Sequence, residues 1–329
     1  MKIFFLILLG TVLLGLQVPA FPAAMQDFSS WLQDLRHAAI QYGISQKLVD
    51  EALPDTLVPD ERVLRLDSKQ PENTVSFERY KKNTIAAVRL QTGRQYMRQY
   101  QSLLKRVGNL YRVDPQYIVA LWGIETSFGQ NVGGFETIPA LTTLAYDGRR
   151  SEFFRRELLI ALKIVDHGDI GLHAMKGSWA GAMGQCQFMP SSFEKYAQDY
   201  NKDGKRDIWN TREDVFASTA AYLSAEGWQR GQPFMRLVRL PKSFDNRMMG
   251  LNIQKSARFW QDAGVRLANG QRPPADTCSL GSIIQPGGKG YKTYIVYNNY
   301  RIIMKWNYST YFATAVGLFA DQLKLNVYD

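Results

Sequence analysis

The chain has 329 residues, 45% of them hydrophobic and 21% charged, and without internal repeats or low-complexity tracts this composition excludes a fibrous or largely disordered protein. Its two cysteines, Cys186 and Cys278, exclude a disulfide-based scaffold and allow at most one bridge. The net charge of +10 predicts a polyanionic partner. Nucleic acid is not expected, because the basic residues are scattered and no nucleic-acid-binding motif is present; an anionic cell-wall polymer or membrane surface fits better.

The N-terminus predicts an exported protein. Residues 1–16 carry one positive charge followed by an apolar run, and Val18 and Ala20 supply small residues at a cleavage site, so residues 1–20 are predicted to be a signal peptide. The apolar run is shorter than the roughly 20 residues that a membrane span needs. No cysteine lies in the first 30 residues, so a lipid anchor is not expected. We expect a soluble periplasmic protein.

Helices are predicted along most of the chain as far as residue 226. Residues 27–53 are helical, with one apolar face, until Pro54 and Pro59 interrupt the pattern. Residues 77–110 are predicted to form one long basic amphipathic helix, packed on a core rather than on a membrane. Further helices are predicted at 139–146, 152–165, 190–200 and 213–226, the last opened by Thr211 and Asp214 as a variant capping box.

Glu125 is the one charged residue in the segment Ala120–Gly129. Asp114 and Pro115 predict a helix start, as an N-cap and a first-turn proline, and Gly129 is a plausible stop. Glu125 shares an apolar stripe, at i, i+3, i+4 and i+7 spacing, with Ile118, Leu121 and Trp122.

A carboxyl group on a buried stripe has a characteristic chemistry. Burial without a partner is costly and raises the pKa of a carboxyl, so we expect Glu125 to be protonated near neutral pH. A protonated acid in a cleft can protonate a poor alkoxide leaving group. The alternative is a glutamate that turns to the surface or pairs with an arginine.

A glycine- and alanine-rich stretch, residues 177–184, is too permissive for a helix interior and suits close backbone approach. Together with the residues up to Ser192 it supplies hydroxyl groups, amides and Trp179. Amides and hydroxyls bind sugar substituents and aromatic rings pack on sugar faces, although each residue taken alone could serve a local cap or turn. Arg149 and Arg150, which precede a predicted helix, could hold acidic or peptide-bearing groups.

Residues 199–210 resemble an EF-hand calcium loop, with Gly204 at the sixth position. Two positions depart from the motif: Arg206 stands where an apolar residue is usual, and Asn210 cannot give the bidentate carboxylate of the twelfth position. The alternative is a turn held by its own Asx side chains. If calcium binds, we expect a structural ion, and its candidate ligands are Asp199, Asn201, Asp203, the Lys205 carbonyl and Asp207.

After Trp228 the pattern changes to short β-branched and aromatic runs, which predict a small β-rich insert with one helix near 256–263. The predicted strands are 234–240, 282–285, 291–297 and 300–307. Residues 311–323 are predicted to be helical again. The fold class is therefore mainly α (α+β).

Four segments together resemble the lytic murein transglycosylase B family, in the same order from about residue 28 to about residue 323. They are Trp122-Gly-Ile-Glu-Thr-Ser-Phe-Gly129, the arginines 149–150, the stretch Gly177–Ser192 with its Gly-Ala-Met-Gly and Gln-Phe-Met-Pro-Ser motifs, and Trp306–Val316. The resemblance implies a lysozyme-like helical catalytic core with a flanking α-helical region and a small β-rich insert. The expected organisation is a signal peptide over 1–20, an α-helical region over 21–110, the core with its EF-hand-like loop over 111–230, the β insert over 231–300 and a returning segment over 301–329.

The resemblance also implies the activity. Glu125 would be the sole acid/base that cleaves the β-1,4 bond between N-acetylmuramic acid and N-acetylglucosamine in peptidoglycan, forming 1,6-anhydro-N-acetylmuramic acid without a cofactor. Its implied glycan contacts are Arg149, Arg150, Ser178, Gln187, Tyr222 and Asn307. A hydrolytic muramidase, which would need a second carboxylate such as Glu136, Asp147 or Glu152 to position water, and a non-catalytic peptidoglycan-binding protein remain alternatives.

Overall fold

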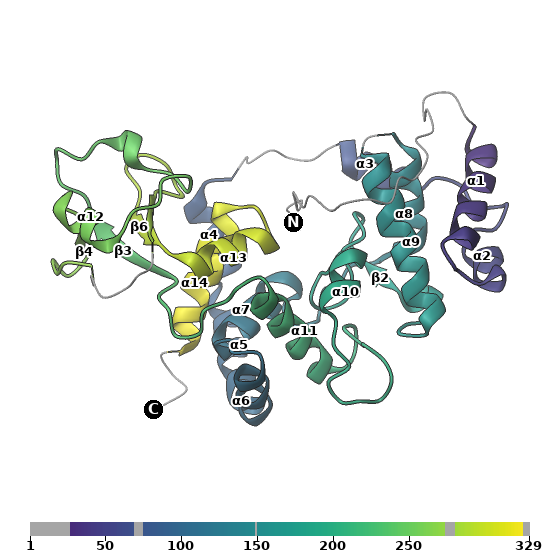
Figure 1. Cartoon of the computed structure of the whole chain (residues 1–329), viewed down its shortest axis with the longest axis horizontal. Helices are drawn as coiled ribbons and strands as arrows, with labels where there is room; N and C mark the ends of the chain where they lie inside the picture. Colours follow the sequence, from purple (N-terminus) through teal and green to yellow (C-terminus); the bar gives the residue numbers. More distant parts are fainter. Residues whose placement is uncertain (1–26, 69–74, 149, 274–279, 325–329) are drawn as a thin grey trace. The chain divides into compact units, whose positions relative to one another are not determined.

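The computed structural model describes residues 27–68, 75–148, 150–273 and 280–324. Within them the protein is mainly helical, with a two-stranded and a four-stranded antiparallel sheet (Figure 1). This confirms the predicted mainly α class with a small β component. The predicted signal peptide, Arg149 and Cys278 lie outside the described residues.

The described residues form two compact units. One draws on the described residues 75–121, 223–273 and 280–324, and the other on 27–68, 122–148 and 150–222. Two helices, α7 (Pro115–Thr126) and α11 (Arg212–Ala225), each contribute residues to both units.

The unit that contains Trp122–Tyr222 is built around two helices that lie side by side, α8 (Thr137–Tyr146) and α9 (Ser151–His167) (Figure 1). The helices α2 and α10 pack on α9, and α3 packs on α8. The other elements of this unit are α1 (Phe28–Gln41), α2 (Gln46–Ala52), α3 (Glu61–Ser68), α10 (Pro190–Tyr196), the short helix η1 (Leu172–Ala174) and the paired strands β1 (Phe135–Glu136) and β2 (Lys176–Gly177).

The helices predicted in this unit are confirmed, with shifts at their ends, but α3 was not predicted. The region 27–53 forms α1 and α2, which begin at the side-chain caps Asp27 and Ser45. The helix predicted over 190–200 ends earlier, at Tyr196. The two residues of the predicted capping box bond elsewhere. The Asp214 carboxylate accepts hydrogen bonds from the backbone N–H groups of Tyr200 and Asp207, and the Thr211 hydroxyl donates to Asp207 Oδ2.

The other unit combines helices with the four-stranded sheet, whose strand order is β4-β3-β6-β5. Helix α14 (Thr310–Lys324) packs against α4, α5 and α13. Its remaining elements are α4 (Phe77–Thr84), α5 (Ala87–Gln99), α6 (Gln101–Leu110), α12 (Ala257–Asp262), α13 (Asn298–Trp306), η2 (Asn246–Met248), β3 (Met235–Arg239), β4 (Arg266–Leu267), β5 (Ser282–Ile284) and β6 (Thr293–Val296).

The single helix predicted over 77–110 is wrong, since the segment forms α4, α5 and α6. The backbone leaves the helical region at Ile85, with φ −109° and ψ 52°, and at Tyr100, with φ −102° and ψ 18°. The Arg89 guanidinium donates to the carbonyl of Thr84 and so supplies a partner to the end of α4. The apolar spacing continues across both breaks, which is why periodicity alone does not show them.

The strand predicted over 300–307 is also wrong, because this segment is the helix α13. Tyr300, Ile303 and Trp306 are buried at a helical spacing. The Tyr300 hydroxyl lies 3.0 Å from Thr314 Oγ1, on α14. Packing of α13 on α14 therefore overrides the β propensity of its aromatic and β-branched residues.

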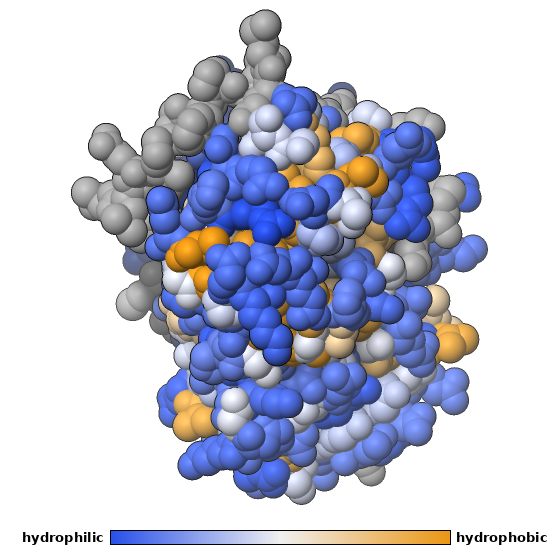
Figure 2. Space-filling view, turned by 90° about the vertical axis from the view of Figure 1, so that its right-hand side faces the viewer, coloured by the Kyte–Doolittle hydropathy of each residue, from blue (hydrophilic) through white to orange (hydrophobic). Residues whose placement is uncertain are grey.

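The other predicted strands and the short helix of the insert are confirmed. Ser256 caps α12, and the sheet packs on Trp260 around a core that includes Val238, Ile283 and Ile295. Among the described residues, no helix combines the length and apolar character that a membrane crossing requires. Figure 2 shows one face of the molecule, on which hydrophilic residues predominate and hydrophobic residues occupy small separate areas.

Candidate active site

Glu125 lies in the last turn of α7 and is half-buried. The seven residues from Tyr117 to Gly123 are all buried, so α7 is enclosed on every side rather than along the one predicted stripe. The carboxyl of Glu125 thus stands where a fully enclosed helix becomes partly accessible.

The turn after Glu125 has an unusual backbone. The helix ends at Thr126, three residues before the predicted stop at Gly129, and Ser127, Phe128 and Gly129 all have positive φ angles of 50°, 62° and 84°. A side chain in this region costs roughly 1–2 kcal/mol per residue. Such strain persists only where the surroundings fix it, and here Phe128 is buried.

Gln185, which the sequence did not single out, connects this turn to the loop 177–189. Its Oε1 accepts a hydrogen bond from Trp122 Nε1 at 2.7 Å, and its Nε2 donates to the Trp209 carbonyl at 2.5 Å. The Thr126 hydroxyl donates to the Gln185 carbonyl at 3.2 Å. These buried bonds fix the residues on either side of Glu125 against the loop, because breaking one would leave a buried polar group unpaired.

The glycines of this loop pack against the protein itself. A Cβ at Gly177 would lie 2.1 Å from the Ala182 carbonyl oxygen, and one at Gly181 would lie 2.4 Å from Leu141. The predicted close backbone approach is therefore present, but the loop makes it with its own neighbours.

Gln187 has one half of its amide anchored and the other half unpaired. Its Nε2 donates to the carbonyls of Val132 and Gly184, each at 2.9 Å. Its Oε1 is buried and has no hydrogen-bond partner among the residues that the structure describes. A buried acceptor without a partner is rare in folded proteins. Gln187 therefore keeps an unused acceptor beside its two anchored donors, and its predicted contact with the glycan stays a prediction.

Ser178 takes part in the fold of the loop. Its Oγ accepts a hydrogen bond from Ala182 N at 3.0 Å, and its backbone N–H donates to the Ala182 carbonyl at 2.7 Å. This agrees with the local alternative for Ser178, while its hydroxyl proton can still be donated to a ligand.

We expect Gln187→Ala to lower activity about tenfold beyond any loss of folded protein, since a neutral hydrogen bond is worth about 0.5–1.5 kcal/mol. Ser178→Ala should lower the melting temperature, with a smaller specific effect on activity. Thermal unfolding and activity per folded molecule, measured on both variants, separate the two roles. A Gln187→Ala enzyme that melts earlier yet turns over normally would assign Gln187 to loop structure.

Cys186 lies between the two glutamines in the sequence of the loop. It is a buried free thiol whose Sγ lies 3.5 Å from Thr219 Oγ1. Burial raises the pKa of Cys186 to about 12, and the nearby charges of Glu125 and Asp214 act in the same direction.

The other predicted contact residues have diverse surroundings. Tyr222 is buried, with its ring 4.6 Å from that of Tyr196. Arg150 is exposed, and its Nη2 lies 3.1 Å from the buried Asp67 Oδ1. Asn307 is buried and its Oδ1 lacks a partner among the described residues, but it belongs to the other unit. Arg149 is outside the described residues, and the contact roles of all four stay predictions.

The three carboxylates considered for a hydrolase, Glu136, Asp147 and Glu152, are all exposed. Glu136 Oε2 lies 3.4 Å from His173 Nδ1. None of the three shares the partly enclosed position of Glu125, which distinguishes Glu125 as the candidate acid.

The loop 199–210 is held by its own side chains. Asp199 accepts hydrogen bonds from the N–H groups of Asp203 and Gly204, at 3.1 and 2.9 Å, and Asp203 accepts one from Lys205 N. The all-oxygen donor set suits calcium. Among the described residues, however, no three His, Cys, Asp or Glu side chains are grouped closely enough to hold a metal ion. The contacts match the Asx-turn alternative, and the calcium site stays a prediction.

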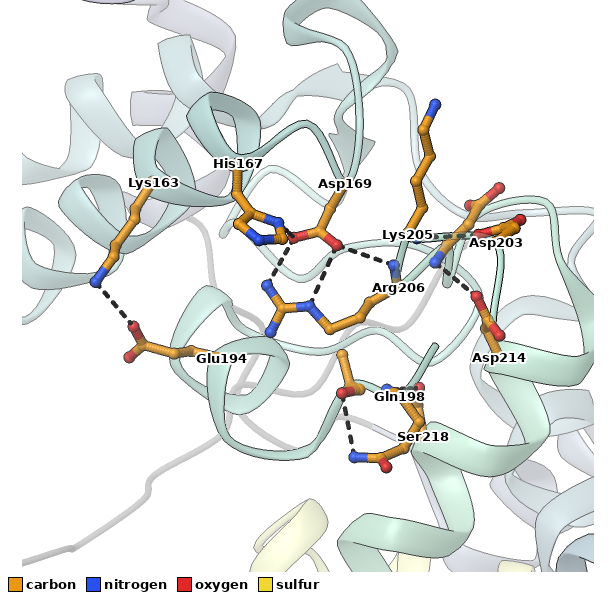
Figure 3. A network of polar contacts seen from close by, with 12 residues as sticks. Lys163, His167, Asp169, Glu194, Gln198, Asp203, Lys205, Arg206, Asp214 and Ser218 are labelled. Carbon is orange, nitrogen blue, oxygen red and sulfur yellow. Dashed lines mark hydrogen bonds and ion pairs between the residues drawn. The ribbon is translucent and has the colours of Figure 1, made fainter. Parts of the chain in front are cut away.

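Arg206, the residue that departs from the calcium motif, has a structural partner. Figure 3 shows its guanidinium on Asp169, with Nη2 2.6 Å from Oδ2, and His167 on the same carboxylate. Burial raises the pKa of Asp169, but the hydrogen bonds and charge of Arg206 outweigh it, and the pKa is lower than usual. The ion pair with Asp169 holds the loop 199–210 at Arg206, its eighth residue. No sequence pattern indicated Asp169 as the partner.

We expect excess calcium to raise the melting temperature of metal-stripped protein if the loop binds the ion in the native state alone. The shift should be modest because Asn210 lacks a carboxylate, and Asp203→Ala should abolish it. Thermal unfolding with and without calcium, with magnesium as control, measures this. An unchanged melting temperature would leave the loop as a plain turn.

The chain is similar to known proteins over most of its length. The chain matches the Transglycosylase SLT domain family over residues 27–321. It is 30% identical over 291 residues to the membrane-bound lytic murein transglycosylase B of Escherichia coli (strain K12), covering 84% of this chain and 77% of that protein.

Two solved structures are similar over most of their length. The SltB3 protein of Pseudomonas aeruginosa, in complex with NAG-anhNAM-pentapeptide, has a TM-score of 0.88 and 41% identity, covering 91% of this chain and 80% of that one. The Escherichia coli lytic transglycosylase Slt35, in complex with calcium, has a TM-score of 0.78 and 29% identity, covering 89% and 92%. These likenesses confirm the resemblance drawn from the four sequence segments and the lysozyme-like fold that it implied.

Proposed function

The chain belongs to the Transglycosylase SLT domain family, and from this membership we propose that it is a lytic transglycosylase that cleaves peptidoglycan between N-acetylmuramic acid and N-acetylglucosamine. The observation that carries the proposal is Glu125, half-buried at the end of an enclosed helix and fixed beside the loop of Gln185 and Gln187.

The proposed mechanism uses one carboxyl group twice. Protonated Glu125 donates its proton to the glycosidic oxygen, and the bond from that oxygen to C1 breaks. The resulting carboxylate takes the proton of the C6 hydroxyl of the same N-acetylmuramoyl residue while O6 attacks C1. Glu125 is protonated again, a 1,6-anhydro ring is formed and no water is consumed. Because O6 and C1 belong to one sugar, the attack has the entropic advantage of an intramolecular reaction.

Two structures of one relative, SltB3, support the substrate and product. Structures of SltB3 hold NAG-anhNAM-pentapeptide in one case and NAG-NAM-pentapeptide in another, which are peptidoglycan fragments with an anhydro and a non-anhydro sugar. We propose the same polymer as the substrate here, with Gln187 Oε1 accepting a hydrogen bond from an N–H or hydroxyl group of the sugar. The proposal needs no cofactor and includes export to the periplasm.

We expect the mature enzyme to release muropeptides that end in 1,6-anhydro-N-acetylmuramic acid from purified sacculi. Mass spectrometry of digests made in H₂¹⁸O distinguishes this from hydrolysis, because an anhydro product is one water lighter and carries no label from the solvent. Borohydride should also leave it unreduced. Labelled, reducible ends would assign the protein to the hydrolytic muramidases, whose second carboxylate would then have to be found.

A further inference from the structure

The positive charge of the chain is concentrated in the β-rich segment, residues 231–300. This segment holds ten Lys and Arg residues against three Asp residues, whereas the rest of the chain holds 30 Lys and Arg against 27 Asp and Glu. A net charge of +7, out of +10 for the whole chain, therefore lies in about a fifth of the sequence. Charge elsewhere is nearly balanced, so the polyanionic partner predicted from the net charge should meet this segment.

The fold places these cations outside the core of the segment. The sheet β4-β3-β6-β5 and α12 pack around the buried residues Val238, Trp260, Ile283 and Ile295. The exposed cations are Arg236, Arg239, Lys242, Arg247, Lys255, Arg258, Arg272, Lys289 and Lys292.

Among the residues that the structure describes, most of these charges form no ion pair with a carboxylate. Within the described part of the segment, Arg247 alone forms an ion pair, with Asp245 at 2.9 Å. Arg239 on β3 stands directly opposite Arg266 on β4 in the strand register. Like charges in this position repel, so the pair destabilises the sheet unless an anion lies near it. Arg266 at least donates to the carbonyls of Gln261 and Val265.

We propose that the β-rich segment is a second, non-catalytic contact with the cell wall, which binds the carboxylates of the peptide stems of peptidoglycan. This rests on the proposed function, since the wall polymer is taken to be the substrate. Arginine forks match carboxylates in geometry as well as charge. Each stem peptide ends in a carboxylate, as in the pentapeptide fragments bound by SltB3. Repeated anions on a hydrated polymer complement dispersed, unpaired cations.

The exposed apolar residues of the segment favour this polymer over a bilayer. The large exposed apolar residues in the described part of the segment come from β3, from α12 and from two loops, and they are Leu237, Phe259, Leu280 and Tyr291. The Lys255 ammonium nitrogen lies over the ring of Phe259, 5.4 Å from the ring centre. A membrane-surface element instead presents one continuous apolar face to the acyl chains.

The test is co-sedimentation with intact sacculi, carried out in a Glu125→Gln background so that the polymer is not digested. The patch variant adds Arg239→Glu, Arg258→Glu and Lys292→Glu. The matched control reverses three exposed cations outside the segment, Lys47→Glu, Arg98→Glu and Lys105→Glu, so the net charge changes equally. At low ionic strength we expect the patch variant to bind about tenfold more weakly, since each exposed pair is worth roughly 0.2–1 kcal/mol, and the control to bind nearly normally.

Three further measurements sharpen the result. Sacculi whose carboxyl groups are blocked as neutral amides should bind the Glu125→Gln protein weakly. This binding should be as weak as that of the patch variant to native sacculi. Salt of about 0.5 M should remove the difference between variants, because it screens exposed charges. Vesicles of phosphatidylglycerol should bind less protein than sacculi do. If the reversed variant does not fold, Arg239→Gln, Arg258→Gln and Lys292→Gln replace it.

Equal binding by the patch and control variants, or full binding to carboxyl-blocked sacculi, would overturn the proposal. Preferential binding to vesicles would assign the segment to the membrane instead. Binding is measured without turnover, so a hydrolytic product from the unsubstituted enzyme would refute the proposed function and leave this result intact.

Discussion

Glu125→Gln is expected to leave folding and glycan binding intact while lowering turnover by about 10²–10⁴-fold. Glutamine keeps the volume and the hydrogen-bonding ability of the half-buried side chain but cannot deliver a proton. The enclosed helix and the Gln185 bonds that position this turn do not depend on the carboxyl group. The measurements are the rate of anhydro-muropeptide release, the melting temperature and binding to sacculi.

The matched control is Glu136→Gln, because Glu136 is exposed and pairs only loosely with His173. We expect it to retain near-normal activity. A Glu125→Gln variant that keeps half of the normal activity would show that Glu125 is not the catalytic acid. A large loss in Glu136→Gln would instead point to a second carboxylate and therefore to hydrolysis.

The sequence predicted the element that carries Glu125 because its signals are local. Asp114 and Pro115 mark the start of α7 where the structure begins it, and the apolar residues before Glu125 are buried. The side chain of Asp114 makes a contact that no local pattern shows, since its Oδ2 accepts from Trp228 Nε1 at 3.0 Å. Pairings across more than a hundred residues are set by the folded chain.

The wrong predictions for residues 77–110 and 300–307 also arise because contacts distant in sequence leave no local pattern. The breaks at Ile85 and Tyr100 interrupt no apolar pattern, and Tyr300 is helical because of what it meets on α14. At the candidate site, Gln185 sits in the recognised loop next to Gln187, yet only the structure shows which glutamine fills its hydrogen bonds within the protein and which keeps an acceptor unpaired. Side-chain direction decides such roles, and sequence spacing alone does not determine it.

The glycine at position 129 shows how strongly this site depends on packing, and we expect Gly129→Ala to destabilise the protein by about 2–6 kcal/mol beyond the strain of a left-handed alanine. Overpacking costs about 1–3 kcal/mol and an unpaired buried group about 1–3 more. With φ at 84°, a Cβ here would lie 2.3 Å from Gln185 Oε1, far inside contact distance. Gln185 cannot move aside without losing its bonds to Trp122 and the Trp209 carbonyl.

A matched control separates this clash from backbone strain. Gly168 has a similar φ of 90° at the end of α9, and a Cβ there would meet nothing within 4 Å. Gly168→Ala should therefore cost only the strain of a left-handed alanine, roughly 1–2 kcal/mol. Thermal or denaturant unfolding of both variants gives the comparison. Equal losses would mean that contact with Gln185 contributes nothing.

A double-mutant cycle tests the mechanism itself. Gln185→Ala removes the side chain that Gly129→Ala would strike, and it already forfeits the bonds to Trp122 and Trp209. Adding Gly129→Ala to Gln185→Ala should then cost little more than Gly168→Ala does, so the two losses are strongly non-additive. Because Gln185 fixes the turn next to Glu125, both single variants should also lose activity per folded molecule. Additive losses in stability would show that Gly129 and Gln185 act independently and that Gly129 does not hold Glu125 in place through Gln185.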